Sequence, residues 1–361
     1  MGFSLSSRAL KYGYSNARSK AMKGLLLKMS FLEELIKVRT IDAMVELLQR
    51  THYKEDLIAL SMHYSGSTLI ELAAGRNFAK IVAKLKKFTP KDDDPAVRAL
   101  LRKWDILNLK TLIDGKRLGR SYEEIRPFLL PIGDLSEDDF ERIAKAGERT
   151  LFEEIKHTPL GEEMLSISTA GFSRQMWEAF RNSLRNMNQF VQLETILDGY
   201  TYLFMQKALH EVKGRDISVI GALLKREIDA KNILIIERLK KHGFSKEKIR
   251  NYLIQGGSLS ESLLERLMES RDFNSTVTLV KSKFGRFELK EGQLTLADLE
   301  IALEKAGAAY KSLAFHRSIL SIGAILGIIL LKEEELHNLR KIAKAKEFKV
   351  PESEVREMLV V

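Results

Sequence analysis

One pattern limits how this chain can fold more than any other: a long stretch of it recurs at an offset of 124 residues. With that offset and no gap, roughly 15 of the 39 positions from 105 to 143 are identical, and a weaker third copy lies at an offset of 230. A unit this long has the size of a small domain rather than of a solenoid repeat. Each copy carries an acidic residue and an asparagine three positions apart: Asp105 and Asn108, Asp229 and Asn232, and Glu335 and Asn338.

The residues favour helices throughout. Leu, Lys, Glu, Ala and Arg dominate, only 6 of 361 residues are Pro, and few segments alternate as strands do. "GRSYEE" and "GFSKEK" each place a helix-ending Gly before a Ser that can cap the next helix. The sequence therefore predicts an all-α protein with a helical N-terminal segment and three similar helical repeat domains: residues 1–30, 31–133, 134–257 and 258–361.

The repeated acid and asparagine allow two interpretations. They can form a ligand site, because side chains three residues apart lie on one face of a helix. They can instead satisfy backbone groups between packed helices, as buried polar side chains almost always do. We favour the structural role, since a single site needs its residues once and not in every copy.

The sequence contains no recognisable motif for catalysis or metal binding. The sequence lacks a phosphate-binding loop, HExxH, GxSxG and GxGxxG, and its seven His do not cluster. The pairs Glu154/His157 and Glu334/His337 have the spacing of di-iron helices, but Pro159 interrupts the first and the two occupy unrelated repeat positions. With no Cys for thiolate ligands or nucleophiles, we expect no catalytic residue, no cofactor and no metal site.

The net charge of +10 favours an anionic partner: nucleic acid, lipid headgroups or an acidic protein surface. The longest apolar run, residues 318–331, is shorter than the roughly 20 residues of a membrane span, so we expect a buried helix there. The first residues lack the apolar core of a signal peptide. Composition and repeats alone also fit a basic helical scaffold that binds RNA or an acidic protein. However, no base-stacking or base-reading motif accompanies the lysines, so we do not expect nucleic acid as a partner.

The opening "YGYSNARSKAMKGLLL", the repeated acid-x-x-Asn and "LSIGAILGIILLKEEELHNLRKIAKAK" together resemble one family over nearly the whole chain. It is the family of the C subunit of archaeal A-type ATP synthases and V-type ATPases, to which the d subunit of the eukaryotic vacuolar ATPase also belongs. The opening motif consists of Tyr12, Tyr14, Asn16, Ala17 and Arg18.

The resemblance implies three helical domains around a pseudo-threefold axis in a funnel, with no catalytic residues. It implies a rotor subunit that rests on the proteolipid (c/K) ring, receives central-stalk subunits of the D and F type, and transmits torque for ATP-coupled proton or sodium transport. We therefore expect a peripheral protein at the cytoplasmic face of the cell membrane, in contact with its surface. Candidate partner-interface residues are Tyr14, Arg18, Arg126, Arg250 and Arg356.

Overall fold

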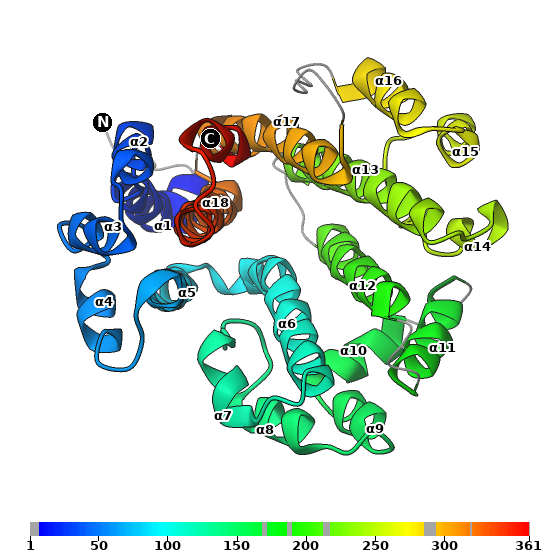
Figure 1. The fold of residues 1–361 in the computed structure, drawn as a ribbon, viewed down its shortest axis with the longest axis horizontal. Helices are drawn as coiled ribbons and strands as arrows, with labels where there is room; N and C mark the ends of the chain where they lie inside the picture. The colour runs from blue at the N-terminus through cyan, green and yellow to red at the C-terminus, as the bar shows by residue number, and fades with distance from the viewer. Residues whose placement is uncertain are drawn as a thin grey trace. The chain divides into compact units, whose positions relative to one another are not determined.

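The computed structural model describes residues 7–167, 172–185, 190–211, 217–284, 294–317 and 320–360. Within these ranges every regular element is a helix (Figure 1), which confirms the all-α prediction. The helices are α1 (Ser7–Lys23), α2 (Met29–Lys37), α3 (Ile41–Leu48), α4 (Lys54–Leu60), α5 (Gly66–Phe88), η1 (Lys91–Asp93), α6 (Asp94–Arg117), α7 (Tyr122–Ile125), η2 (Arg126–Phe128), α8 (Glu137–Lys145), α9 (Leu151–Lys156), α10 (Pro159–Ile167), α11 (Phe172–Arg185), α12 (Phe190–Glu211), α13 (Ile217–Lys241), α14 (Lys246–Arg250), α15 (Glu261–Glu269), α16 (Phe273–Phe284), α17 (Leu296–Arg317), α18 (Ile322–Glu347) and α19 (Glu352–Met358).

Contacts between residues divide the chain into two compact units. The first combines Met1–Asp94 with Gly307–Val361, and the second is Pro95–Ala306. Both boundaries fall inside expected repeat domains: one lies at the first residue of α6 and the other lies within α17. The division into domains at residues 133 and 257 stays a prediction.

Helix α18 is central to the first unit, where it packs against α5 and α1 (Figure 1). Its N-terminal part, from Ile322 to Leu330, is buried on every side. A helix that is apolar all round is stable only when other elements cover it completely. This confirms that the apolar run forms a buried helix from residue 322 onward. No helix in the described part of the chain is long and apolar enough to cross a membrane.

The second unit holds two hydrophobic cores in succession. The first draws its side chains from α6 to α12 and contains the fully buried rings of Phe140, Phe180 and Tyr200. The second draws them from α13 to α17 and is centred on aliphatic residues such as Ile228 and Leu299. Each core therefore begins with a long helix that carries the repeated acid and asparagine.

The three long helices that carry the repeat, α6, α13 and α18, end in the same turn. The second residue after the helix has a left-handed backbone in all three: Gly119 (φ 67°), Gly243 (φ 73°) and Lys349 (φ 56°). In each turn the next N–H donates to a carbonyl five residues earlier, at 2.9, 3.1 and 2.8 Å respectively. This is the usual glycine-ended helix stop, and the third copy makes it with a lysine.

A lysine in the last turn of each of these helices reaches the end of a short helix that packs nearby. The last carbonyls of a helix lack partners within it and carry partial negative charge, so a lysine ammonium stabilises them. The bonds join Lys116 to the carbonyls of Ala144 and Ala146 (2.6 Å each), Lys240 to Ser270 Oγ (2.6 Å) and the Leu267 carbonyl (3.4 Å), and Lys346 to the carbonyls of Ile36 (2.8 Å) and Val38.

Candidate functional site

The three repeated asparagines are buried and make the same pair of hydrogen bonds. In each copy the amide nitrogen donates to the carbonyl of the residue 22 positions later, and the amide oxygen accepts from the N–H of that same residue. Two bonds to one loop residue hold the segment after α7, α14 or α19 against the long helix. The pairs are Asn108 with Leu130 (2.7 and 2.8 Å), Asn232 with Ile254 (2.8 and 2.7 Å) and Asn338 with Val360 (2.6 and 3.1 Å).

The repeated aspartates bind backbone as well. Asp105 accepts from the N–H groups of Asp134 (3.0 Å) and Leu135 (3.1 Å), and Asp229 accepts from those of Ser258 (2.7 Å) and Leu259 (3.0 Å). The glycine just before each loop is required. A Cβ on Gly133 would lie 2.1 Å from Asp105 Oδ1, and one on Gly257 would lie 2.3 Å from Asp229 Oδ1. These glycines recur in the sequence because a carboxylate occupies the space of their missing side chains.

In the third copy the acid binds a segment from the other end of the chain. Glu335 Oε2 accepts from the N–H of Leu27, which lies just before α2. Helix α2 contacts α19 as α8 contacts α7 and α15 contacts α14. The N-terminal residues thus continue the third copy, after α19, where the other two copies continue along the chain.

Glu335 also belongs to a buried polar cluster, in which Lys332 contacts the acid three residues later as Arg102 contacts Asp105 in the first copy. Its Oε1 accepts from Tyr53 Oη (2.5 Å) and from Lys332 Nζ (2.6 Å). The Lys332 ammonium also donates to Tyr53 Oη (2.8 Å), and it lies 2.8 Å from His52 Nε2. We refer to Glu335, Lys332, Tyr53 and His52 as the Glu335 cluster.

Opposed electrostatic effects act on this cluster. Burial raises the pKa of Glu335, but hydrogen bonds from His52, Lys332 and Tyr53 together with the lysine charge outweigh it and bring the pKa to about 2. Burial lowers the pKa of Lys332 despite the nearby carboxylate. Burial and the Glu335 charge raise the pKa of Tyr53 well above its usual value. The carboxylate is therefore ionised and the phenol neutral near pH 7. Both groups are hydrogen-bonded to other buried side chains of the cluster, so we assign the cluster a structural role.

Three of the five candidate interface residues pair within the protein. Arg126 contacts Glu137 (2.8 Å), Arg250 contacts Glu261 (3.4 Å) and Glu265, and Arg356 contacts Glu33 (2.9 Å) and Glu352 (3.1 Å). The acids on α8, α15 and α2 lie on the helices that receive the repeated lysines. Each arginine thus pairs with a corresponding helix in its own copy. These ion pairs explain why the arginine recurs in all three copies.

The other two candidates lie on α1. Tyr14 is 68% exposed, and its ring meets the edge of Phe88 at 6.1 Å between centroids. Arg18 is exposed one turn further along the same helix. The opening motif also contains Asn16, which is buried and binds Leu320 and Ser321, the two residues just before α18.

Of the two pairs with di-iron spacing, Glu154/His157 belongs to the second unit and Glu334/His337 to the first. Among the described residues, no group of three or more His, Asp or Glu side chains has the geometry to hold a metal. His157 follows the end of α9, where its Nδ1 lies 2.7 Å from the carbonyl of Glu153.

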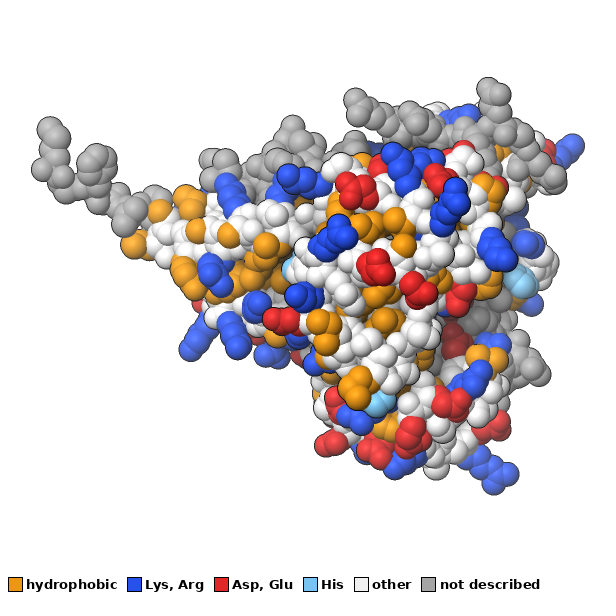
Figure 2. Space-filling view, turned by 60° about the vertical axis from the view of Figure 1, so that its left-hand side comes forward, with side chains coloured by type: hydrophobic (Ala, Val, Ile, Leu, Met, Phe, Trp, Pro, Cys, Tyr) orange, Lys and Arg blue, Asp and Glu red, His pale blue; other side chains and the backbone are white. Residues whose placement is uncertain are grey.

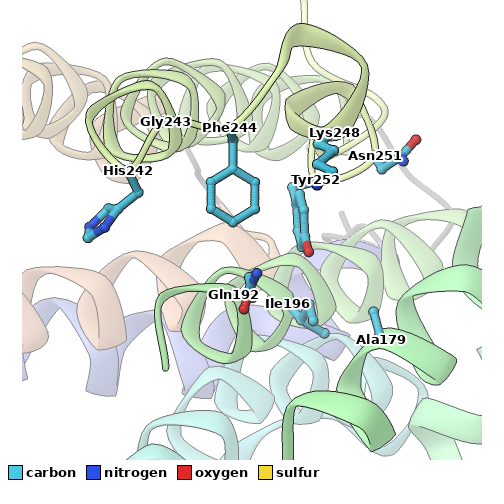
Figure 3. Close-up of a pocket in the computed structure, with 9 residues that line it drawn as sticks. All are labelled: Ala179, Gln192, Ile196, His242, Gly243, Phe244, Lys248, Asn251 and Tyr252. Atoms are coloured by element: carbon cyan, nitrogen blue, oxygen red, sulfur yellow. The ribbon is translucent and has the colours of Figure 1, made fainter. Parts of the chain in front are cut away.

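A cavity of about 650 Å³ lies in the second unit, between α12 and the corner that joins α13 to α14 (Figure 3). The rings of Phe244 and Tyr252 point from this corner toward Gln192 and Ile196, and meet edge to face at 6.2 Å. Its volume suits a small ligand. The nine described residues that line it include no carboxylate: Ala179, Gln192, Ile196, His242, Gly243, Phe244, Lys248, Asn251 and Tyr252.

Sequence reasoning missed the three lysines that end the long helices. Lys116, Lys240 and Lys346 are related by the same offsets of 124 and 230 as the acids and asparagines. That identity was available in the sequence. The chain has many lysines and most lysines are solvated, so a repeated lysine is an ambiguous signal. A repeated asparagine on an apolar helix is a clearer one.

Comparison with known proteins identifies the family. A family model described as "ATP synthase (C/AC39) subunit" matches residues 15–358. A protein from Methanococcoides burtonii, named as the C subunit of an A-type ATP synthase, is 28% identical, over 99% of this chain and 96% of its own length. Proteins of the same name from Methanosarcina mazei and Pyrococcus horikoshii are 27% and 26% identical, over 97% and 96% of this chain and 93% and 90% of their own lengths. The chain therefore belongs to the ATP synthase (C/AC39) subunit family.

Proposed function

We propose that this chain is a non-catalytic rotor subunit of an A-type ATP synthase, placed at the cytoplasmic face of the membrane. In that role it links central-stalk subunits of the D and F type to the proteolipid ring and transmits torque for ATP-coupled ion transport. The observation that carries the proposal is the family match over residues 15–358, together with relatives that bear the name of this subunit.

The repeated contacts support such a role. Each copy fastens its long helix to neighbouring loops by the same asparagine, acid and lysine bonds. We propose that the three copies act as three equivalent modules of a closed body. A rotor adaptor must resist twisting through many distributed contacts, and buried bonds of this kind make each module stiff.

Reconstitution with and without the chain tests the proposal. A vesicle preparation that contains the soluble motor, the central stalk and the membrane sector should pump ions upon addition of ATP only when this chain is present. Without it, we expect ATP hydrolysis to continue uncoupled. The chain alone should hydrolyse no ATP and should bind the stalk subunits in a pull-down. Equal pumping with and without the chain would refute the adaptor role.

Deletion of residues 258–361 is an unsuitable variant for this test. It would remove α18, which packs against α5 and α1 in the first unit, so that unit would lose its central helix as well. A failed deletion would report misfolding rather than lost coupling. Omission of the whole chain avoids this ambiguity.

A further inference from the structure

Helix α1 buries small polar side chains and exposes large apolar ones. Ser15, Asn16 and Ser19 are buried against the first unit, whereas Leu10 is 71% and Tyr14 68% exposed. A helix on the surface of a globular protein normally has the opposite arrangement.

Specific bonds fix this orientation. The side chain of Asn16 donates to the carbonyl of Ser321 (3.0 Å) and accepts from the N–H of Leu320 (2.8 Å). Leu320 has a left-handed backbone (φ 51°), so the chain makes an unusual turn before α18 at the residue that Asn16 binds. The helix cannot rotate its apolar side inward without breaking both bonds.

The charges of α1 are all positive. Its 17 residues include five Lys or Arg and no Asp or Glu. Lys11 is neutralised by Asp92 and Asp93, at 3.3 Å each, while Arg18 and Lys20 are exposed. At about 100° per residue, Arg18 and Lys20 lie roughly 80° to either side of Leu10. Between them runs a stripe of exposed side chains: Leu10, Tyr14, Ala17 and Ala21.

We propose that this α1 surface (Leu10, Tyr14, Ala17, Arg18, Lys20 and Ala21) lies on the anionic lipid headgroups of the membrane. The membrane in question is the one that carries the ring, so this part rests on the proposed function. An apolar stripe with cations on both flanks is typical of a helix that lies in the interface plane. The stripe enters the boundary of the acyl chains, and the long basic side chains reach back to the phosphates.

Other occupants fit the surface less well. Nucleic acid would use the cations but would leave the exposed Leu10 without a role. Hydrophobic side chains also reach the surface elsewhere, between lysines and arginines, on the face in Figure 2. Helix α1 differs in that one helix, fixed by the bonds of Asn16, carries an exposed apolar stripe and basic residues but no acidic residue.

Flotation with lipid vesicles tests the proposal on the full chain. Vesicles of phosphatidylcholine with about 30% phosphatidylglycerol should bind it at least tenfold better than vesicles of phosphatidylcholine alone, and added salt should weaken the binding. The variant L10S/Y14S should lose at least tenfold in binding. The variant R18E/K20E should lose at least 25-fold, because each cation near an anionic surface contributes about fivefold.

Matched controls carry the same changes elsewhere. I58S/M62S alters two exposed apolar residues, one in α4 and one just after it (52% and 86% exposed), and K225E/K241E reverses two exposed lysines of α13. Both should float as the unchanged chain does. All variants should keep its melting temperature, since none of the changed residues is buried.

Two outcomes would overturn the proposal. If the unchanged chain does not float with the anionic vesicles but still binds the stalk subunits, the lipid contact is wrong and the adaptor role stands. If L10S/Y14S and R18E/K20E lose binding to the detergent-solubilised ring or to the stalk subunits, the α1 surface is a protein interface.

Discussion

Replacement of Lys349 by glycine should stabilise the protein, although it deletes a long side chain. Lys349 is an exposed residue with φ 56° at the position where the other two copies have glycine. A side chain in the left-handed region costs roughly 1–2 kcal/mol. Glycine removes this cost but gives the unfolded chain more freedom, which costs about 0.4–1 kcal/mol. The expected net gain in the free energy of unfolding is about 0.5–1 kcal/mol. For a unit of about 150 residues this corresponds to a rise in Tm of about 1–4 °C.

Urea unfolding, followed with a probe in the first unit, measures the effect. Lys349→Ala serves as the matched control, because it removes the same charge and keeps the strained backbone. It should leave stability almost unchanged. The reverse changes, Gly119→Ala and Gly243→Ala, place a Cβ in open space, so backbone strain alone should lower stability by about 1 kcal/mol. If Lys349→Gly is no more stable than Lys349→Ala, the reasoning from φ is wrong.

Three further predictions concern the repeated network. Asn232→Leu leaves the N–H and carbonyl of Ile254 unpaired and should lower the free energy of unfolding by about 2–4 kcal/mol. The exposed Asn251→Leu is its control, and equal losses would contradict the assignment. Lys116→Met removes the cation from the end of α8 and should cost about 1–2 kcal/mol in urea unfolding, whereas loss of stalk binding without loss of stability would make Lys116 an interface residue. The pKa of Glu335 is about 2 in the folded state, below its usual 4.5, so its ionised form stabilises the protein above pH 4.5. That stabilisation, about 3 kcal/mol, should disappear as the pH falls from 4.5 to 2, and Glu335→Gln should lack this pH dependence; an unchanged acid transition in that variant would refute it.

Local sequence patterns and the internal repeat were enough to predict the fold class and the buried asparagines. Helix formers and capping residues indicated the all-α fold, and the repeat singled out Asn108, Asn232 and Asn338. Their role followed from physical reasoning alone, because a buried amide on an apolar helix must find backbone partners. The identity of those partners, 22 residues later in each copy, required the structure.

Contacts between distant residues could not be read from the sequence. His52 and Tyr53 lie about 280 positions from Lys332 and Glu335, and no periodicity links them. The sequence analysis named Arg126, Arg250 and Arg356, which recur in the three copies, as candidate interface residues. In the structure their recurrence reflects ion pairs inside each copy.

The joining of Glu335 to Leu27 has a consequence for how the protein is made. The first unit consists of residues from both ends of the chain, so Leu27 emerges from the ribosome long before its partner exists. The roughly 210 residues between the two segments take about 10–40 s to synthesise at 5–20 residues per second. During that interval the second unit is synthesised, and α5 lacks the helix that covers it. The N-terminal helices must therefore wait, with apolar faces uncovered, for the last segment to be released.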